Sequence, residues 1–252
     1  MKTYLIDLDG TMYRGTQIIE GAKEFIDDLL ARDEKFVFLT NNAKRTKTQN
    51  VEHMVKMGFK GIKEEHFFTS SMAAARYTAK NYAGRNAYYI GQDGLKEALC
   101  NEGFTISEED VDFVFVGLDV EGNYEKYSKA LGFLLQGAQL IGTNNDRLLA
   151  KPSGFNVGNG SIVAMFEYAI GKESPRIGKP YAPILEEALL YFGLTKEDVI
   201  VLGDNLETDI LLGVHNGVET TFVTSGVHHV EDIEKLQIHP TNIVNDLREL
   251  IK

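Results

Sequence analysis

The chain has 252 residues, of which 43% are hydrophobic and 25% are charged. This composition is typical of a folded globular protein, and the length allows one large domain or two smaller ones, since domains average roughly 150 residues. The 26 Lys and Arg residues against 37 Asp and Glu residues give a net charge of −11. This acidic balance argues against binding to nucleic acid or to an anionic membrane surface, because both require clustered positive charge.

The N-terminus and the cysteine content predict a cytoplasmic protein. The first residues reach an acidic side chain at Asp7, which is not typical of a signal peptide. The apolar runs are far shorter than the ~20 residues that a membrane-spanning helix needs. A lone cysteine, Cys100, fits a reducing compartment, and we expect it to be packed or partly buried at a helix end.

Short apolar segments alternate with an amphipathic helix near the N-terminus. Residues 3–6 are apolar and run into the polar sequence 7–11, which predicts a buried strand followed by a loop. Residues 22–30 carry apolar side chains at helical spacing. Residues 36–39 then predict a second strand, which ends at the polar residues 40–42.

The same alternation returns near the C-terminus. A helix is predicted over residues 184–192, with Gly193 as its cap, and strands are predicted over residues 199–202 and 221–224. Alternating strands and helices predict an α/β fold with a Rossmann-like parallel sheet. Sheets of this kind bind ligands beyond the carboxyl ends of their strands.

The segment between the two α/β parts is too long for a single crossover and predicts an inserted domain. It contains strand-like residues 87–91, 113–117 and 139–142 and helical residues 94–99 and 124–136. We therefore expect a core formed by residues 1–80 and 178–252 and an inserted α/β cap over residues 81–177. The helix around residues 73–75 is expected to belong to the core.

Acidic and polar side chains follow three of the predicted strands. They are Asp7 and Asp9 after the first strand, Thr40 at the end of the second, and Asp204 and Asp209 after strand 199–202. Neighbouring carboxylates are stabilised by a divalent cation, and Mg²⁺ prefers carboxylate, water and phosphate oxygens. A solvated acidic turn is the ordinary explanation of an isolated Asp-x-Asp pair. Three such strand ends, together with Lys179 just before a helix that starts near Pro180, instead indicate a phosphate-handling metal site.

Four motifs in this order give the chain a resemblance to the haloacid dehalogenase (HAD) superfamily. They are Asp7-Leu8-Asp9-Gly10-Thr11, Leu39-Thr40-Asn41-Asn42, Gly178-Lys179-Pro180, and Gly203-Asp204-Asn205 through Thr208-Asp209. The insertion and its sequence Thr143-Asn144-Asn145-Asp146 resemble the C2-type α/β cap of subclass IIA, the NagD-like or 4-nitrophenylphosphatase-like branch. The resemblance covers essentially the whole chain and implies an HAD core with an inserted cap.

The resemblance implies a Mg²⁺-dependent phosphatase that hydrolyses small phosphomonoesters through an aspartyl-phosphate. Sugar phosphates, nucleotides and p-nitrophenyl phosphate are the expected substrates. Asp7 would be the nucleophile and Asp9 the general acid and base, while Asp7, Asp204 and the Asp9 main-chain carbonyl would hold the metal.

The remaining motif residues take supporting roles in the same resemblance. Thr40, Asn41 and Lys179 would bind the phosphoryl group, with Thr40 and Lys179 also counted as catalytic. Asp209 and Asn205 would act indirectly by orienting the residues that contact the metal and the phosphoryl group, Asp209 by orienting Lys179 or a metal-bound water.

The cap is expected to select the substrate. Asn145, Asp146 and Asn159 can hydrogen-bond substrate hydroxyls, although Asn also forms turns readily. The loop over residues 153–161 is expected to face the active site. It lacks the glycine spacing of a nucleotide-binding loop. The pair His228-His229 is expected in an exposed loop rather than at a metal.

Other readings of the sequence stay open. A phosphotransferase or phosphomutase uses the same machinery, and a non-catalytic phosphometabolite-binding protein would keep the same motifs. A dehalogenase is disfavoured because a halide leaves without the proton that Asp9 supplies. A homodimer formed through the cap is a further expectation.

Overall fold

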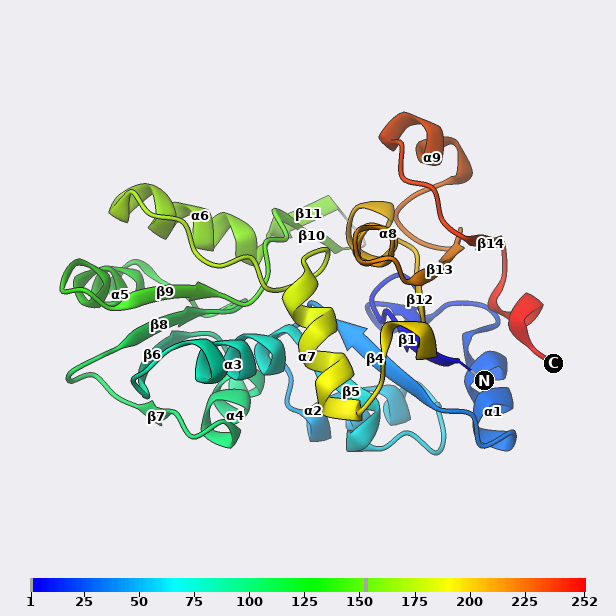
Figure 1. The fold of residues 1–252 in the computed structure, drawn as a ribbon, viewed down its shortest axis with the longest axis horizontal. Helices are drawn as coiled ribbons and strands as arrows, with labels where there is room; N and C mark the ends of the chain where they lie inside the picture. The colour runs from blue at the N-terminus through cyan, green and yellow to red at the C-terminus, as the bar shows by residue number, and fades with distance from the viewer. Residues whose placement is uncertain (1, 152–153) are drawn as a thin grey trace. The chain divides into compact units, whose positions relative to one another are not determined.

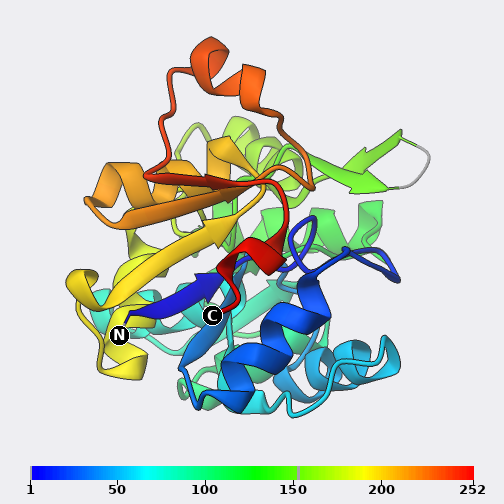
Figure 2. The same ribbon diagram turned by 90° about the vertical axis from the view of Figure 1, so that its right-hand side faces the viewer.

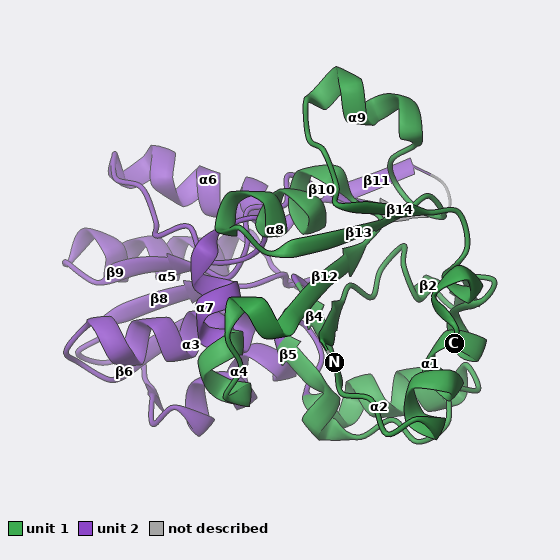
Figure 3. Ribbon diagram, turned by 45° about the vertical axis from the view of Figure 1, so that its right-hand side comes forward, with its two compact units in different colours: residues 1–40, 47–68, 188–252 green, residues 41–46, 69–187 purple. Residues whose placement is uncertain are grey.

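The computed structural model describes residues 2–151 and 154–252, which form two compact units (Figure 3). Unit 1 comprises Met1–Thr40, Lys47–Phe68 and Ala188–Lys252, and unit 2 comprises Asn41–Thr46 and Thr69–Glu187. Helix α3 (Ser70–Asn81) belongs to unit 2, whereas the sequence analysis assigned this region to the core. The domain boundaries at residues 80 and 178 stay a prediction.

Unit 1 is built on a six-stranded sheet with the order β14-β13-β12-β1-β4-β5. Its strands are β1 (Thr3–Ile6), β4 (Phe36–Thr40), β5 (Phe67–Thr69), β12 (Val199–Gly203), β13 (Glu219–Val223) and β14 (Asn242–Val244). Strand β1 pairs in parallel with β4 on one side and with β12 on the other (Figure 2). The parallel α/β sheet predicted from the sequence is confirmed.

Helices cover the sheet of unit 1 because its strands are apolar on both faces. Helix α1 (Ala22–Ala31) buries Phe25, Ile26 and Leu29 in one cluster with the strand residues Ile6 and Phe38. A second cluster packs β13 against the elements that follow β12 and β13; its buried members are Leu206, Ile210, Phe222, Ile233 and Ile238. These two clusters hold the central strands in place and leave their carboxyl ends for polar residues.

Shorter elements complete unit 1. They are β2 (Tyr13–Arg14), β3 (Gln17–Ile18), α2 (Lys47–Lys56), η1 (Glu64–His66), η2 (Lys196–Asp198), the π-helical turn η3 (Leu206–Ile210), α8 (Leu211–Asn216), α9 (Val230–Leu236) and η4 (Leu247–Leu250). Helix α7 (Ala182–Phe192) contains the last residues of unit 2 and the first of the final segment of unit 1.

Unit 2 contains a four-stranded parallel sheet with the order β7-β6-β8-β9 (Figure 1). Its elements, besides α3, are β6 (Asn86–Ile90), α4 (Asp93–Asn101), β7 (Thr105–Ile106), β8 (Phe113–Val116), α5 (Tyr124–Leu135), β9 (Gln139–Gly142) and α6 (Asn159–Ile170). Helices α5 and α6 pack on one face, and α3 and α4 lie on the other. The sequence predicts an α/β insertion in this part of the chain, and unit 2 has this α/β architecture.

The structure also adds an element that the sequence analysis did not predict. An antiparallel hairpin, β10 (Leu148–Lys151) and β11 (Gly154–Val157), precedes α6. The loop predicted over residues 153–161 is therefore strand at residues 154–157 and helix from residue 159, with Gly158 between them, while residue 153 lies outside the described residues. Leu148, Phe155 and Val157 of the hairpin are exposed.

Two expectations about single residues are wrong. Cys100 is exposed, because it lies on the solvent side of α4, whose buried face carries Leu95, Ala98 and Leu99. Of the pair His228-His229, expected in an exposed loop, His229 is exposed, but His228 is only 14% exposed at its side chain, and its Nδ1 accepts a hydrogen bond from the main-chain N–H of Leu206 over 3.1 Å. Within the two described ranges, no helix has the length and apolar character needed to cross a membrane.

Candidate active site

The register of the sheet in unit 1 brings three strand ends to one edge. Ile6 in β1 pairs with Leu202 in β12 and with Phe38 in β4. The residues that follow these positions therefore leave the sheet together, because parallel strands end on the same side. Asp7 follows β1, Asp204 follows β12, and Thr40 is the last residue of β4.

Three carboxylates converge at this edge. Oxygens of Asp7, Asp204 and Asp209 lie within 4.8 Å of one another, and all three residues are buried. Asp9, in contrast, is an exposed residue in the loop after β1. The cluster thus includes Asp209, which the sequence analysis assigned to a supporting role.

Asp204 is held by groups from two other loops. The Thr11 hydroxyl donates to its Oδ1 over 2.9 Å, and the main-chain N–H of Val227 donates to its Oδ2 over 2.7 Å. A β-carbon on Gly10 or on Gly226 would clash with the Asp204 carboxylate. Glycine at these two positions therefore makes room for the buried carboxylate.

Asp209 is placed by the turn that follows β12. The main-chain N–H of Asn205 donates to its Oδ2 over 3.2 Å, and a β-carbon on Gly203 would clash with its side chain. The Asn205 side chain accepts from the N–H of Glu207 over 2.9 Å and so caps the turn η3. The turn carries Asp209 back towards the end of the strand that precedes it.

The chemistry of the cluster fits a divalent cation. Three buried carboxylates so close together repel one another unless a cation neutralises them or protons are taken up. Oxygen donors of this kind suit hard cations such as Mg²⁺. The residues present therefore fit a divalent metal, and Asp7, Asp204 and Asp209 are the side chains that could hold it.

The other predicted phosphoryl-binding residues lie at buried positions. Thr40 is buried in unit 1 at the carboxyl end of β4. Asn41 and Lys179 are buried in unit 2 and bind each other. The Lys179 N–H donates to the Asn41 Oδ1 over 2.8 Å, and the Asn41 Nδ2 donates to the Lys179 carbonyl over 3.1 Å. The Asn41 Nδ2 also donates to Oδ1 of Asp146 over 3.0 Å.

The predicted specificity residues of the cap differ in their surroundings. Asn159 is 2% exposed, and its Nδ2 donates to the carbonyls of Val116 and Asn144, each over 3.1 Å, and to Oγ1 of Thr143 over 3.3 Å. Asn145 is partly exposed. The contacts of Asn159 join the carboxyl ends of β8 and β9 to the start of α6, and its contact with a substrate stays a prediction.

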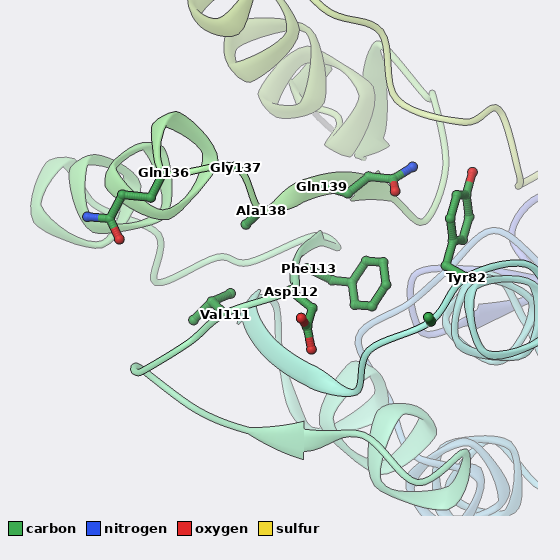
Figure 4. A pocket seen from close by; sticks show the side chains of 9 residues that line it. Tyr82, Val111, Asp112, Phe113, Gln136, Gly137, Ala138 and Gln139 are labelled. Carbon is green, nitrogen blue, oxygen red and sulfur yellow. The ribbon is translucent and has the colours of Figure 1, made fainter.

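Unit 2 contains a hollow whose lining includes none of these residues; Figure 4 shows the side chains that line it. It has a volume of about 370 Å³ and is lined by Tyr82, Ala83, Val111, Asp112, Phe113, Gln136, Gly137, Ala138 and Gln139. These residues precede or begin β6, β8 and β9, so the hollow lies at the amino ends of these strands. It is therefore at the opposite end of the sheet of unit 2 from Asn145 and Asp146, which follow the carboxyl end of β9.

Sequence reasoning gave no role to three groups that shape the site. Thr11 and Gly10 lie in the first motif, and Gly226 follows β13 in the sequence Ser225-Gly226. The position of Gly226 in the loop that follows β13 was the available signal, since loops after parallel strands meet at the site.

Comparison with known proteins places the chain in a family. A family described as haloacid dehalogenase-like hydrolase matches residues 4–105, and a second HAD hydrolase-like family matches residues 176–250. The acid sugar phosphatase of Staphylococcus aureus (strain MRSA252) is 39% identical over 251 residues, covering 99% of this chain and 96% of the relative. The chain belongs to the haloacid dehalogenase-like hydrolases.

Two further proteins are similar to this chain over nearly its whole length. The 5′-nucleotidase YutF of Bacillus subtilis (strain 168) is 37% identical over 254 residues, covering 99% of this chain and 97% of the relative. The structure of NagD from E. coli K-12 is similar with a TM-score of 0.90 and 32% identity, covering 99% of this chain and 98% of NagD. Within the family, the chain is a member of the NagD-like branch, subclass IIA.

Proposed function

We propose that this chain, an HAD-type phosphoric monoester hydrolase, is a Mg²⁺-dependent phosphatase of small phosphorylated metabolites. The observation that carries the proposal is the buried cluster of the Asp7, Asp204 and Asp209 carboxylates at the carboxyl edge of the sheet in unit 1. The names of its relatives, an acid sugar phosphatase and a 5′-nucleotidase, support sugar phosphates and nucleotides as the substrate class. p-Nitrophenyl phosphate is a convenient artificial ester of the same type.

In this proposal, the reaction takes two steps: Asp9 donates a proton in the first step and accepts one in the second. First, a carboxylate oxygen of Asp7 forms a bond to phosphorus while the bond from phosphorus to the ester oxygen breaks, and Asp9 donates its proton to that oxygen. Then a water oxygen attacks phosphorus, the bond to Asp7 breaks, and Asp9 takes the proton from the water. The products are the alcohol and inorganic phosphate, and Asp7 and Asp9 return to their starting forms.

The remaining groups stabilise and orient the phosphoryl group in the proposal. Mg²⁺, held by Asp7, Asp204 and the Asp9 main-chain carbonyl, would supply positive charge next to the phosphoryl oxygens. Thr40 would donate a hydrogen bond to a phosphoryl oxygen, and the Lys179 ammonium would offset negative charge there. Asp209 supports the cluster from the turn after β12, either as a ligand or by orienting one.

Metal removal and one substitution test the proposal together. We expect EDTA to abolish hydrolysis of p-nitrophenyl phosphate and of a panel of sugar phosphates and nucleotides, and Mg²⁺ to restore it. Asp7→Asn is expected to leave no measurable turnover, because an amide is a poor nucleophile. Asp33→Asn is the matched control, because Asp33 is exposed in the same unit and has φ 53°, which Asn tolerates.

The outcomes separate clearly. Full activity in excess EDTA would contradict the metal, and turnover by Asp7→Asn equal to that of Asp33→Asn would contradict the nucleophile. A cytoplasmic location and a homodimer formed through the cap stay predictions.

A further inference from the structure

We propose that Asn41 and Asp146 position the main chain of Lys179, and through it the lysine side chain, instead of contacting the substrate. The inference rests on the proposed function, because it concerns the lysine that the proposal assigns to the phosphoryl group. All three residues belong to unit 2. The sequence predicts a direct role in substrate binding for both Asn41 and Asp146.

The Asn41 amide pairs with both main-chain groups of Lys179. Its Oδ1 accepts the Lys179 N–H over 2.8 Å, and its Nδ2 donates to the Lys179 carbonyl over 3.1 Å. The two residues are 138 positions apart, and their exposed fractions are 9% and 3%. A pair of hydrogen bonds to one residue fixes both its position and its orientation, which a single hydrogen bond does not.

Asp146 determines which way the Asn41 amide points. Its Oδ1 accepts the Asn41 Nδ2 over 3.0 Å. An ionised carboxylate only accepts hydrogen bonds, so a flipped amide would set its own oxygen against that of Asp146. With the amide in the observed orientation, its oxygen faces the Lys179 N–H. The carboxylate thus selects the orientation that the pairing with Lys179 requires.

The main chain of Asn41 is anchored as well. The Ser70 hydroxyl and the Asn144 Nδ2 both donate to the Asn41 carbonyl, over 2.7 and 2.8 Å. The residue before the lysine, Gly178, allows the close approach, because a β-carbon there would lie 2.8 Å from the Asn41 Oδ1. The pairing is therefore built into the surrounding fold of unit 2.

The Asn41 side chain has no donor left for a phosphoryl oxygen. A side-chain amide carries two N–H groups, and those of Asn41 go to Asp146 and to the Lys179 carbonyl. Its oxygen, an acceptor, would not bind an anionic phosphoryl oxygen. A positioning role accounts for all of these hydrogen bonds, whereas direct phosphoryl binding by this amide would require breaking one.

A positioning role predicts the same proportional loss for every substrate. The phosphoryl group is common to all phosphomonoesters, so a displaced Lys179 lowers turnover of each of them alike. A direct contact of Asp146 with a substrate hydroxyl predicts instead a loss confined to the metabolite. The ratio of the two losses therefore separates the two roles.

The first experiment measures the position of Lys179 without turnover. Amide hydrogen exchange of the peptide over residues 178–180 reports only Gly178 and Lys179, because Pro180 has no N–H. We expect Asn41→Ala to accelerate exchange of the Lys179 amide. Asn81→Ala is the matched control in the same unit, since its exposed side chain also donates to a carbonyl, that of Tyr77.

The second experiment measures turnover with p-nitrophenyl phosphate and with the best metabolite ester. We expect Asn41→Ala to lower kcat by about 10- to 100-fold for both, as small misplacements of catalytic groups do. Asp146→Ala should lose about tenfold, and Asp146→Asn is expected to lie between Asp146→Ala and the wild type, because its amide keeps an acceptor but its N–H groups also tolerate the flipped Asn41 amide. If Asn41→Ala destabilises the fold, Asp146→Ala carries the same two measurements.

Exchanging the amide of Asn41 and the carboxylate of Asp146 gives a second comparison of activities, one that a loss of packing alone would not change. Asn41→Asp sets two carboxylates against each other and is expected to be less active than Asn41→Ala. Adding Asp146→Asn replaces the repulsion by a hydrogen bond between one amide and one carboxylate and is expected to recover part of the activity lost in Asn41→Asp, but not all of it, because the Lys179 carbonyl still lacks the Asn41 donor.

Each failure has its own signature. Unchanged exchange of the Lys179 amide in Asn41→Ala overturns the positioning role, as does a loss confined to the metabolite ester. A wild-type protein that hydrolyses no phosphomonoester overturns the proposed function instead, and the exchange experiment would still report on the pairing.

Discussion

The hydroxyl of Thr11 donates a hydrogen bond to Oδ1 of Asp204 over 2.9 Å, across 193 positions of the sequence. Thr11 is fully buried. We expect Thr11→Ala to raise the Mg²⁺ concentration needed for half-maximal activity by about 10- to 100-fold, because groups that orient metal ligands contribute that much to affinity. A titration of activity with Mg²⁺ measures this. Thr11→Ser keeps the hydroxyl and should stay near the wild type; equal effects of the two variants would contradict the role.

The exposure of Asp9 fits a residue that exchanges protons with substrate and water. We expect Asp9→Asn to lower kcat by about 10²- to 10⁴-fold, the usual contribution of a positioned acid and base. The loss should be smaller for p-nitrophenyl phosphate than for an alkyl phosphate, because the alkoxide needs the proton more. Steady-state kinetics with both esters measure this, and equal losses would argue against Asp9 as the acid.

Asn159 joins β8, β9 and α6 through its buried amide, whose Oδ1 has no hydrogen-bond partner within the described residues. We expect Asn159→Ala to lower the free energy of unfolding by about 1–3 kcal/mol, because it removes the buried hydrogen bonds of this amide to the Val116 and Asn144 carbonyls and to the Thr143 hydroxyl. Urea unfolding followed by circular dichroism measures this. Asn101→Ala, an exposed position, is the control. A selective loss of kcat/KM for the metabolite ester at unchanged stability would instead support Asn159 as a substrate contact.

His66 makes part of the stability of unit 1 depend on pH. Its ring lies 4.5 Å from that of Phe36, its Nδ1 accepts the Lys63 N–H over 3.1 Å, and burial lowers its pKa from the ordinary value of 6.5. Below pH 6.5, the unfolded chain therefore binds more protons at His66 than the folded protein does. The contribution of the neutral His66 to the free energy of unfolding is full above pH 6.5 and is lost as the pH falls towards the folded pKa.

The measurement is the free energy of unfolding between pH 7.5 and about pH 5. We expect His66→Asn, which keeps an acceptor but does not titrate, to lose less stability over this range than the wild type. His215→Asn, which changes an exposed histidine of α8, is the matched control. The idea fails if His66→Asn follows the wild-type slope.

The sequence predicted what local patterns encode. The strands at residues 3–6, 36–40 and 199–203 and the helix ending at Phe192 follow from apolar periodicity and from the polar residues that stop it. The acidic residues at the strand ends could be predicted because a parallel sheet gathers its carboxyl ends on one edge.

What the sequence did not predict depends on contacts between distant residues. The approach of Asp209 to Asp7 requires the turn η3, and the hydrogen bond of His228 to Leu206 joins two separate loops. Neither leaves a local signal in the sequence. The same holds for Asn41, whose neighbours Asp146 and Lys179 lie more than one hundred residues further along the chain.

The strand order of unit 1 has a consequence for synthesis on the ribosome. Strand β1 lies between β4 and β12, but β12 is made only after residue 198. At ~5–20 residues per second, one edge of β1 waits on the order of 10–40 s for its partner. Nascent chains that end before β12 should therefore remain sensitive to protease within residues 3–40, whereas chains that include residues 199–252 should resist it.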